Sequence, residues 1–236
     1  MQSKLILEEI CKYKNDALAR HHQTFFKCFE GGYGDKNDTF CGIYSKDMKL
    51  IAKRYFRDIT FFELEKLLEN SLHEARTIAL FMLVLKFDKA DMSLKKEIVD
   101  FYLKHTNRIN NWDLVDLSVY KILGRYTFEI DDFEILYTLS NSQNLWEQRM
   151  SVVANWYLIH KGEFNVIVKL CEKFLNHKHD LMHKACGWML REMGKFSDEG
   201  CSELIKFLDK NHKLMPRTML RYSLEKMDKE IKKLYM

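Results

Sequence analysis

The stretch TFFELEKLLENS, from Thr60 to Ser71, decides the class of fold. Its three leucines, at positions 64, 67 and 68, recur at the three- and four-residue spacing of one helix face. Thr60 precedes them as a candidate N-cap, with Glu63 three positions later, and a polar Asn-Ser pair closes the stretch. This pattern predicts a short amphipathic helix followed by a short polar link.

The same periodicity continues along most of the chain. Further segments with helical spacing cover roughly residues 73–87, 92–105, 110–124, 131–139, 144–160, 163–175, 180–194, 197–208 and 216–227. With helices in the first 30 residues, about a dozen short helices are expected, and no strand-like alternation competes with them. We therefore predict an all-α fold.

Composition favours the same fold class. The 236 residues are 47% apolar and 31% charged, which suits one sizeable core and excludes a disordered chain. They include nine glycines and a single proline, Pro216, whereas β-rich domains need both residue types for their many turns. We expect a single domain over residues 1–236.

The helix starts recur about every 15–20 residues, so antiparallel pairs would repeat at roughly 35–40 residues, the period of HEAT- or armadillo-like units. Stacked pairs of this kind curve, and their concave face is an extended binding surface. The spacing predicts a helical-repeat solenoid for which a long polymer is a natural ligand.

The charge distribution, the apolar runs and the cysteines predict a basic surface and the compartment of the protein. Residues 1–170 carry 24 basic and 24 acidic side chains, so the net charge of +4 is confined to residues 171–236, where a basic surface is expected. The longest apolar run, Ile78 to Leu85, is too short to span a bilayer, and the N-terminus lacks an apolar signal segment. Six scattered cysteines without a CxxC pair predict reduced thiols in a cytoplasmic protein.

The segment from Asn110 to Asp116 is the first candidate for chemistry. It places Trp112 and Asp116 one turn apart on one helix face. Its apolar residues occupy other directions and can serve the core: Leu114, Val115 and Leu117. An indole beside a carboxylate is therefore not explained by packing alone. The alternative is that Asp113 or Asp116 caps or pairs near the helix start while Trp112 packs.

The segment from Lys184 to Glu192 places Trp188 and Arg191 on one face in the same way. Gly187 costs this helix about 1 kcal/mol relative to alanine, which is easier to accept if another backbone or a ligand must come close.

Arg149 lies near the start of another predicted helix. Its guanidinium could hold a phosphate by a bidentate contact, or pair with Glu147 or Asp180.

Two further patterns, a glycine-rich loop and a group of histidines and cysteines, have simpler interpretations than a binding site. The glycine-rich loop from Gly31 to Gly34 lacks the following GK[ST] and the preceding strand of a phosphate-binding loop, so it is expected to join helices. Five residues are candidate zinc ligands: His177, His179, His183, Cys171 and Cys186. A zinc site needs four convergent ligands, and these residues contain no second closely spaced pair beside His179 and His183. We therefore expect solvated histidines and no metal or cofactor.

Taken together, these segments resemble the DNA alkylation-repair glycosylases of the HEAT-like-repeat type, the AlkD family. The resemblance covers nearly the whole chain and rests on the order and separation of its motifs. They are Tyr33-Gly34, Phe40-Cys41-Gly42-Ile43, His73-Glu74-Ala75-Arg76, Asn111-Trp112-Asp113-Leu114-Val115-Asp116, Trp146-Glu147-Gln148-Arg149, Lys184 to Glu192, and Met215-Pro216-Arg217-Thr218.

The resemblance implies a catalytic cleft formed by two tryptophans and an aspartate, which fall on Trp112, Trp188 and Asp116. Two arginines on the DNA backbone match Arg149 and Arg191, and a cleft-lining tyrosine matches Tyr33. Because these positions carry the residue types of the family, the resemblance extends to the site. It also places Pro216 at the link into the last helix, where the geometry of the first helical position would suit it.

The implied activity is that of a monofunctional glycosylase without a cofactor. It would release N3- and N7-alkylated purines from duplex DNA as a monomer, without flipping the base, and leave an abasic site. Two alternatives remain open: a non-catalytic helical-repeat module that binds damaged or branched DNA, and a protein-binding scaffold of the same architecture.

Overall fold

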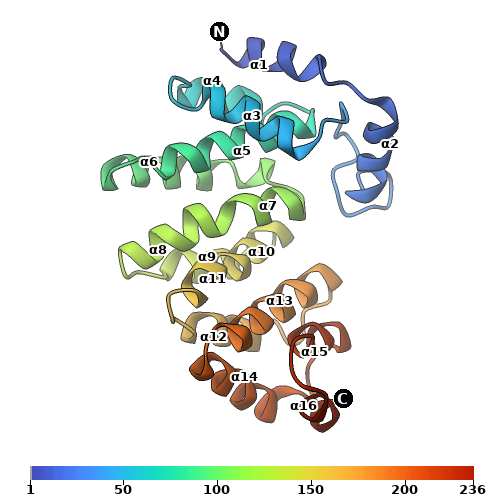
Figure 1. Cartoon of the computed structure of the whole chain (residues 1–236), viewed down its shortest axis with the longest axis vertical. Helices are drawn as coiled ribbons and strands as arrows, with labels where there is room; N and C mark the ends of the chain where they lie inside the picture. Colours follow the sequence, from blue (N-terminus) through green and yellow to red (C-terminus); the bar gives the residue numbers. More distant parts are fainter. Residues whose placement is uncertain (1) are drawn as a thin grey trace. The chain divides into compact units, whose positions relative to one another are not determined.

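A computed structural model describes residues 2–236 (Figure 1). Within these residues the regular elements are helices, and the β pairing consists of one isolated bridge between Thr39 and Leu72. The all-α prediction is confirmed. The chain divides into two compact units between Ser118 and Val119.

The first unit is built around α5. Its elements are α1 (Gln2–Cys11), α2 (Asp16–Phe25), α3 (Ser45–Tyr55), α4 (Phe61–Leu68), α5 (His73–Phe87), α6 (Met92–Lys104), a 3₁₀ turn (Thr106–Arg108) and α7 (Trp112–Val119). α5 packs against α1, α3, α4 and α6. Because neighbours surround it, most of its residues are buried, as expected of a helix that is apolar nearly all round.

The start of α4 confirms the predicted N-cap and changes the role of Glu63. Thr60 Oγ1 accepts a hydrogen bond from the Glu63 backbone N–H at 3.3 Å. The Glu63 carboxylate accepts from the backbone N–H and the hydroxyl of Ser3, at 2.8 and 2.6 Å, rather than turning back to the cap. Glu63 thus ties α1 to α4.

The second unit is built around α13. Its elements are a π-helical turn (Tyr120–Gly124), α8 (Arg125–Glu129), α9 (Glu134–Ser140), α10 (Leu145–Val153), α11 (Asn155–Ile159), α12 (Asn165–Lys173), α13 (Asp180–Phe196), α14 (Asp198–Asn211), α15 (Arg217–Ser223) and α16 (Lys229–Tyr235). α13 packs against α10, α11, α12, α14 and α15. It is the longest helix described and forms the core of this unit.

Two predicted helices are each divided, and their breaks lie against each other. The helix expected over 110–124 becomes α7 and a π-helical turn, and the helix expected over 144–160 becomes α10 and α11 with Ala154 between them. A Cβ on Gly124 would lie 2.2 Å from the Ala154 carbonyl oxygen, so the two main chains are in close contact at the breaks. Such a contact between distant residues is not visible in helical periodicity.

Pro216 is one residue outside the position that the sequence predicts. It is the N-cap of α15, with φ −54° and ψ 139°, and the helix begins at Arg217. Its extended ψ excludes Pro216 from the first helical turn, so it is not the first residue of the helix. The helix that it precedes is also not the last one, because α16 follows. No helix among residues 2–236 is long and apolar enough to cross a membrane.

Candidate functional site

The buried side chain of Asn111 bonds to the first residue of α7. Its Oδ1 accepts a hydrogen bond from the Trp112 backbone N–H at 2.8 Å, and its Nδ2 donates to the Phe26 carbonyl at 2.9 Å. Asn111 therefore satisfies one free N–H of the helix start and ties that start to the segment after α2.

α7 places the predicted pair on a partly exposed side. Trp112 and Asp116 are partly exposed one turn apart, whereas Leu114 and Val115 are fully buried. The expected division between a buried face and an accessible face holds at these positions. Leu117, which was expected to serve the core, is only half-buried.

The Trp112 side chain is held by two segments of the first unit. Its indole N–H donates to the Tyr33 hydroxyl at 3.2 Å, and its ring lies 5.5 Å, centroid to centroid, from both Phe25 and Phe26. The structure therefore brings together Tyr33 and Trp112, two residues that the sequence assigned to one cleft.

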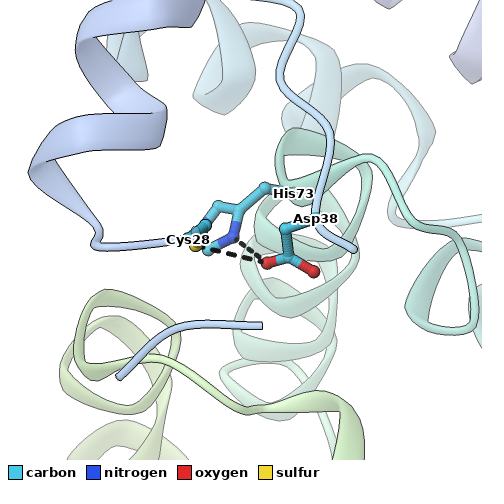
Figure 2. Close-up of side chains that lie close together, drawn as sticks. All are labelled: Cys28, Asp38 and His73. Carbon is cyan, nitrogen blue, oxygen red and sulfur yellow. Dashed lines mark hydrogen bonds and ion pairs between the residues drawn. The ribbon is translucent and has the colours of Figure 1, made fainter. Parts of the chain in front are cut away.

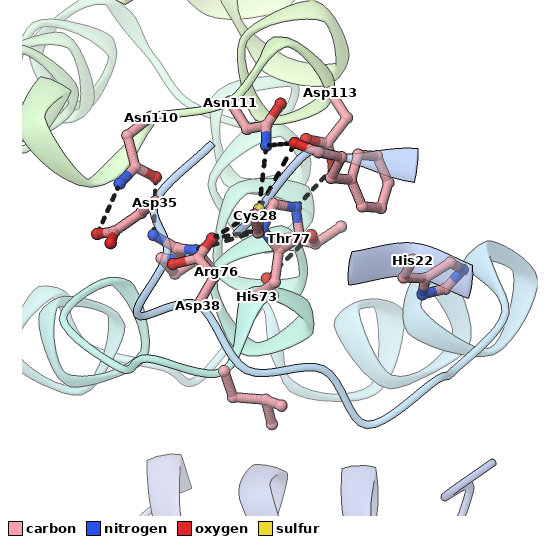
Figure 3. Close-up of polar contacts among 12 residues, drawn as sticks. His22, Cys28, Asp35, Asp38, His73, Arg76, Thr77, Asn110, Asn111 and Asp113 are labelled. Atoms are coloured by element: carbon pink, nitrogen blue, oxygen red, sulfur yellow. Dashed lines mark hydrogen bonds and ion pairs between the residues drawn. The ribbon is translucent and has the colours of Figure 1, made fainter. Parts of the chain in front are cut away.

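A buried polar cluster lies next to this aromatic group (Figure 3). We call it the His73 cluster; its members are Cys28, Asp38, His73, Arg76 and Asp113. His73 Nδ1 lies 3.0 Å from Asp38 Oδ2, and His73 Nε2 lies 2.8 Å from Asp113 Oδ2. The fully buried Arg76 guanidinium donates to the same oxygen of Asp38.

Protonation in the His73 cluster follows from these contacts. Burial lowers the pKa of His73, but Asp113 and Asp38 outweigh it and raise that pKa to about 9. Burial likewise favours neutral Asp38, but His73 and Arg76 hold its pKa below the usual value. Burial and the charge of Asp38 raise the pKa of Cys28 to about 12, so the thiol stays protonated at neutral pH.

Three members of the cluster have the side chains of a metal site (Figure 2). Cys28, Asp38 and His73 each offer a ligand atom within 4.8 Å of the others, the one such group found among residues 2–236. However, Arg76 Nη2 bonds to Asp38 and lies 3.3 Å from His73 Nδ1. The guanidinium already supplies the cation here, and a metal would need the protonated thiol and imidazole to lose their protons. These residues do not fit a metal site.

The sequence alone does not predict this cluster. Its available signal was the pair of cationic residues His73 and Arg76, three positions apart at the start of a helix that continues with the apolar run Ile78 to Leu85. Basic side chains on a buried helix need acidic partners, and that requirement was the clue.

In the second unit, α13 carries Trp188 and Arg191, both partly exposed. Gly187 lies beside them where α15 crosses α13. A Cβ at this position would lie 2.5 Å from the Tyr222 Cβ and 2.6 Å from the Met219 carbonyl oxygen. The expectation that another backbone comes close to Gly187 is confirmed.

Arg191 is held by carboxylates. Its Nη1 forms an ion pair with Glu225, and its Nη2 lies 3.5 Å from Glu192 Oε1. The Arg191 side chain is 19% exposed and that of Glu225 is 48% exposed. The exposed end of this guanidinium is therefore paired with a carboxylate that water can reach.

Arg149 has a more buried position. The residue is only 5% exposed, and its Nη1 donates to the Leu181 carbonyl at 2.7 Å, which links α10 to the first turn of α13. This main-chain carbonyl differs from the partners that the sequence predicts for Arg149, a phosphate or a carboxylate. The burial favours a role in holding α13, and the phosphate contact stays a prediction.

The three histidines near the start of α13 are partly exposed, and each also forms a hydrogen bond within the protein. His177 Nε2 lies 2.9 Å from Gln148 Oε1, and His183 Nε2 bonds to the His177 carbonyl. His179 Nδ1 accepts from the Leu181 backbone N–H at 3.2 Å and caps α13. Burial lowers the pKa values of His177 and His179.

Comparison with known proteins identifies the family of the chain. A family model described as DNA alkylation repair enzyme matches residues 6–227. The chain belongs to this family. Comparison with curated proteins gives no match.

A solved structure supports the fold of this DNA alkylation repair family member. A predicted DNA alkylation repair enzyme from Enterococcus faecalis matches with a TM-score of 0.69 and 16% sequence identity, over 92% of this chain and 97% of that chain. The likeness confirms the fold, and the family points to an enzyme of DNA repair.

Proposed function

We propose that this protein is a monofunctional DNA glycosylase that hydrolyses the N-glycosidic bond of cationic N3- and N7-alkylated purines in duplex DNA. The observation that carries the proposal is the partly exposed pair of Trp112 and Asp116, one turn apart on α7, in a member of the DNA alkylation repair family. The product would be an abasic site.

The chemistry needs few groups. Alkylation at N3 of adenine or N7 of guanine makes the base cationic, so the glycosidic bond is weakened and the leaving base needs no proton. What remains is to stabilise an oxocarbenium-like sugar and to position a water molecule. Asp116 would do both, by its charge and by hydrogen bonding.

Aromatic faces would recognise the cationic nucleotide. Trp112 and Trp188 can each contribute about 0.5–2 kcal/mol by cation–π contact, depending on how far the pair is desolvated. The hydrogen bond between the Trp112 indole and Tyr33 would fix the orientation of the ring, which makes Tyr33 a support for the cleft.

Phosphate contacts would supply affinity without sequence preference. We assign Arg191 to a phosphate, with Arg149 as the second candidate. Because these contacts grip the sugar-phosphate backbone, the proposal does not require base flipping or a second copy of the chain.

Duplex DNA containing 7-methylguanine tests the proposal. We expect the wild-type protein to release free 7-methylguanine, and Asp116→Asn to be slower by about 100-fold or more, because the amide carries no charge. Asp100→Asn is the matched control, since it removes an exposed carboxylate of α6 that pairs with Lys96 at 2.7 Å.

Undiminished release by Asp116→Asn would contradict the proposed role of this residue. If the wild-type protein instead bound DNA in a salt-sensitive manner and released no base, the non-catalytic DNA-binding module would be the correct function.

A further inference from the structure

His73 is a buried histidine that the proposed reaction does not use. It is 2% exposed, and each ring nitrogen faces an aspartate oxygen, of Asp38 at 3.0 Å and of Asp113 at 2.8 Å (Figure 3). An ionised carboxylate only accepts hydrogen bonds, so both ring nitrogens must donate. A ring that donates from both nitrogens is an imidazolium.

Two aromatic rings, those of Phe26 and Phe40, lie side by side against the His73 ring, with their own centroids 5.8 Å apart. Phe26 and Phe40 stack on it at centroid distances of 5.0 Å each, with interplanar angles of 16° and 26°. Aromatic faces attract a cation, most strongly where water is excluded. The site therefore suits a charged ring, with carboxylates at both ring nitrogens and two aromatic rings packed against it.

The charges around His73 balance only while it is protonated. Asp38 and Asp113 face its nitrogens, the Arg76 guanidinium lies 3.3 Å from Nδ1, and the neutral Cys28 thiol lies 3.9 Å from Asp38 Oδ2. Two carboxylates thus face two cations. Loss of the His73 proton would leave one carboxylate charge uncompensated in a buried place, which is costly.

Two contacts connect His73 to Trp112. Asp113 directly follows Trp112 on α7, and its Oδ1 is buried without a partner among residues 2–236, so the bond from His73 is what holds this carboxylate. Phe26, which stacks on His73, contacts the Trp112 ring at 5.5 Å. His73 therefore fixes both the main chain beside Trp112 and a neighbour of its ring.

We propose that His73, as a buried imidazolium, is the positioning residue that sets the orientation of Trp112 and the start of α7 for base release. The inference rests on the proposed glycosylase function. His73 touches no substrate and acts through Asp113 and Phe26.

The first test separates catalysis from binding. We expect His73→Gln to lower the single-turnover rate of 7-methylguanine release by about 10- to 100-fold, because small displacements of a recognition group cost rates of this order. The affinity for the duplex changes less than about threefold, because the residues assigned to phosphates are untouched.

His105→Gln is the matched control for the loss of a buried histidine. His105 is 3% exposed in the same unit, bonds to the Phe101 carbonyl and Glu65 at 2.7 and 3.0 Å, and has no contact with the His73 cluster. We expect it to keep the wild-type rate. Equal rate losses in the two variants, or a loss of affinity in His73→Gln that matches its loss of rate, would overturn the positioning role.

The second test reads Trp112 without any activity. In protein labelled with 5-fluorotryptophan, the ¹⁹F signal missing from Trp112→Phe identifies Trp112. We expect this signal to move in His73→Gln and not in His105→Gln, and in the wild type to move with a midpoint near the His73 pKa of about 9. An unchanged Trp112 signal in His73→Gln, or no alkaline transition in the wild type, would overturn the inference.

The two tests also distinguish the inference from the proposed function. Absence of base release by the wild-type protein would refute the glycosylase, while the ¹⁹F signal would still show whether His73 positions Trp112. If His73→Gln does not fold, Asp113→Asn replaces it, because this variant removes one carboxylate from His73 and keeps the shape of the side chain. We then expect a lower pH midpoint of the Trp112 signal, and an unchanged midpoint contradicts the inference.

Discussion

At the scale of single residues, Arg191, which we propose as a phosphate ligand, already has a carboxylate partner. Its guanidinium pairs with Glu225, whose carboxylate is 48% exposed. A carboxylate and a phosphate present similar oxygen pairs to a guanidinium. If Arg191 binds a phosphate, the DNA must displace Glu225, and this competition weakens binding.

The first residue-scale prediction follows from that competition. We expect Glu225→Gln to tighten binding to duplex DNA by about two- to fivefold, which corresponds to the free energy of an exposed ion pair, about 0.5–1 kcal/mol. Fluorescence anisotropy with a labelled duplex at fixed salt concentration measures the change.

Glu230→Gln is the control for the change in net charge. Glu230 lies in α16, its side chain is 82% exposed, and it pairs with Lys233 at 2.9 Å. Both variants remove one negative charge. An equal gain in affinity in both would mean that net charge, and not the release of Arg191, is responsible.

At the scale of helices, the contact between α13 and α15 depends on Gly187. A methyl group there would lie 2.5 Å from the Tyr222 Cβ and 2.6 Å from the Met219 carbonyl oxygen, atoms that move only with the backbone of α15. Overpacking costs about 1–3 kcal/mol, against a gain of about 1 kcal/mol in helix propensity. We expect Gly187→Ala to lower the free energy of unfolding by up to about 2 kcal/mol, measured by urea denaturation.

Gly194 is the matched control on the same helix. A Cβ at Gly194 meets the Leu204 Cδ2 at 2.5 Å, the far end of a flexible side chain that can turn away. We expect Gly194→Ala to be neutral or to stabilise by up to about 1 kcal/mol. If both variants destabilise equally, the close approach of α15 is not the cause.

Local signals explain which elements could be predicted. α4 follows from apolar periodicity and a capping residue, α5 follows from its apolar residues alone, and the cost of Gly187 pointed to a close backbone. The breaks at Gly124 and Ala154 could not be predicted, because each depends on main chain about 30 residues away. The same reason hid the His73 cluster, whose members come from positions 28 to 113.

At the scale of the whole molecule, the candidate residues and the charge are distributed unequally. Tyr33, Trp112 and Asp116 belong to the first unit, while Trp188 and Arg191 belong to the second. Residues 171–236, which carry the whole basic excess, also belong to the second unit. The carboxylate proposed for catalysis and the long-range attraction for a polyanion are therefore carried by different halves of the chain.

The stability of the folded protein as a whole is expected to depend on the His73 proton. Folding raises the pKa of His73 from 6.5 to about 9. A group whose pKa is raised by folding stabilises the folded state fully below its unfolded pKa and loses this contribution as pH rises through the folded pKa. We expect the free energy of unfolding to fall by about 2 kcal/mol between pH 6 and pH 8.5.

Urea denaturation at the two pH values, with two variants, separates this contribution from other titrations. Cys28, with a pKa raised to about 12, keeps its proton across this range in the folded protein, and its unfolded thiol begins to titrate only near the upper limit. His73→Gln has no proton to lose and is expected to lose most of the pH dependence, whereas His105→Gln retains it. If wild type and His73→Gln lose the same stability between pH 6 and pH 8.5, His73 is not an imidazolium in the folded protein, because only a proton bound more tightly after folding produces this slope.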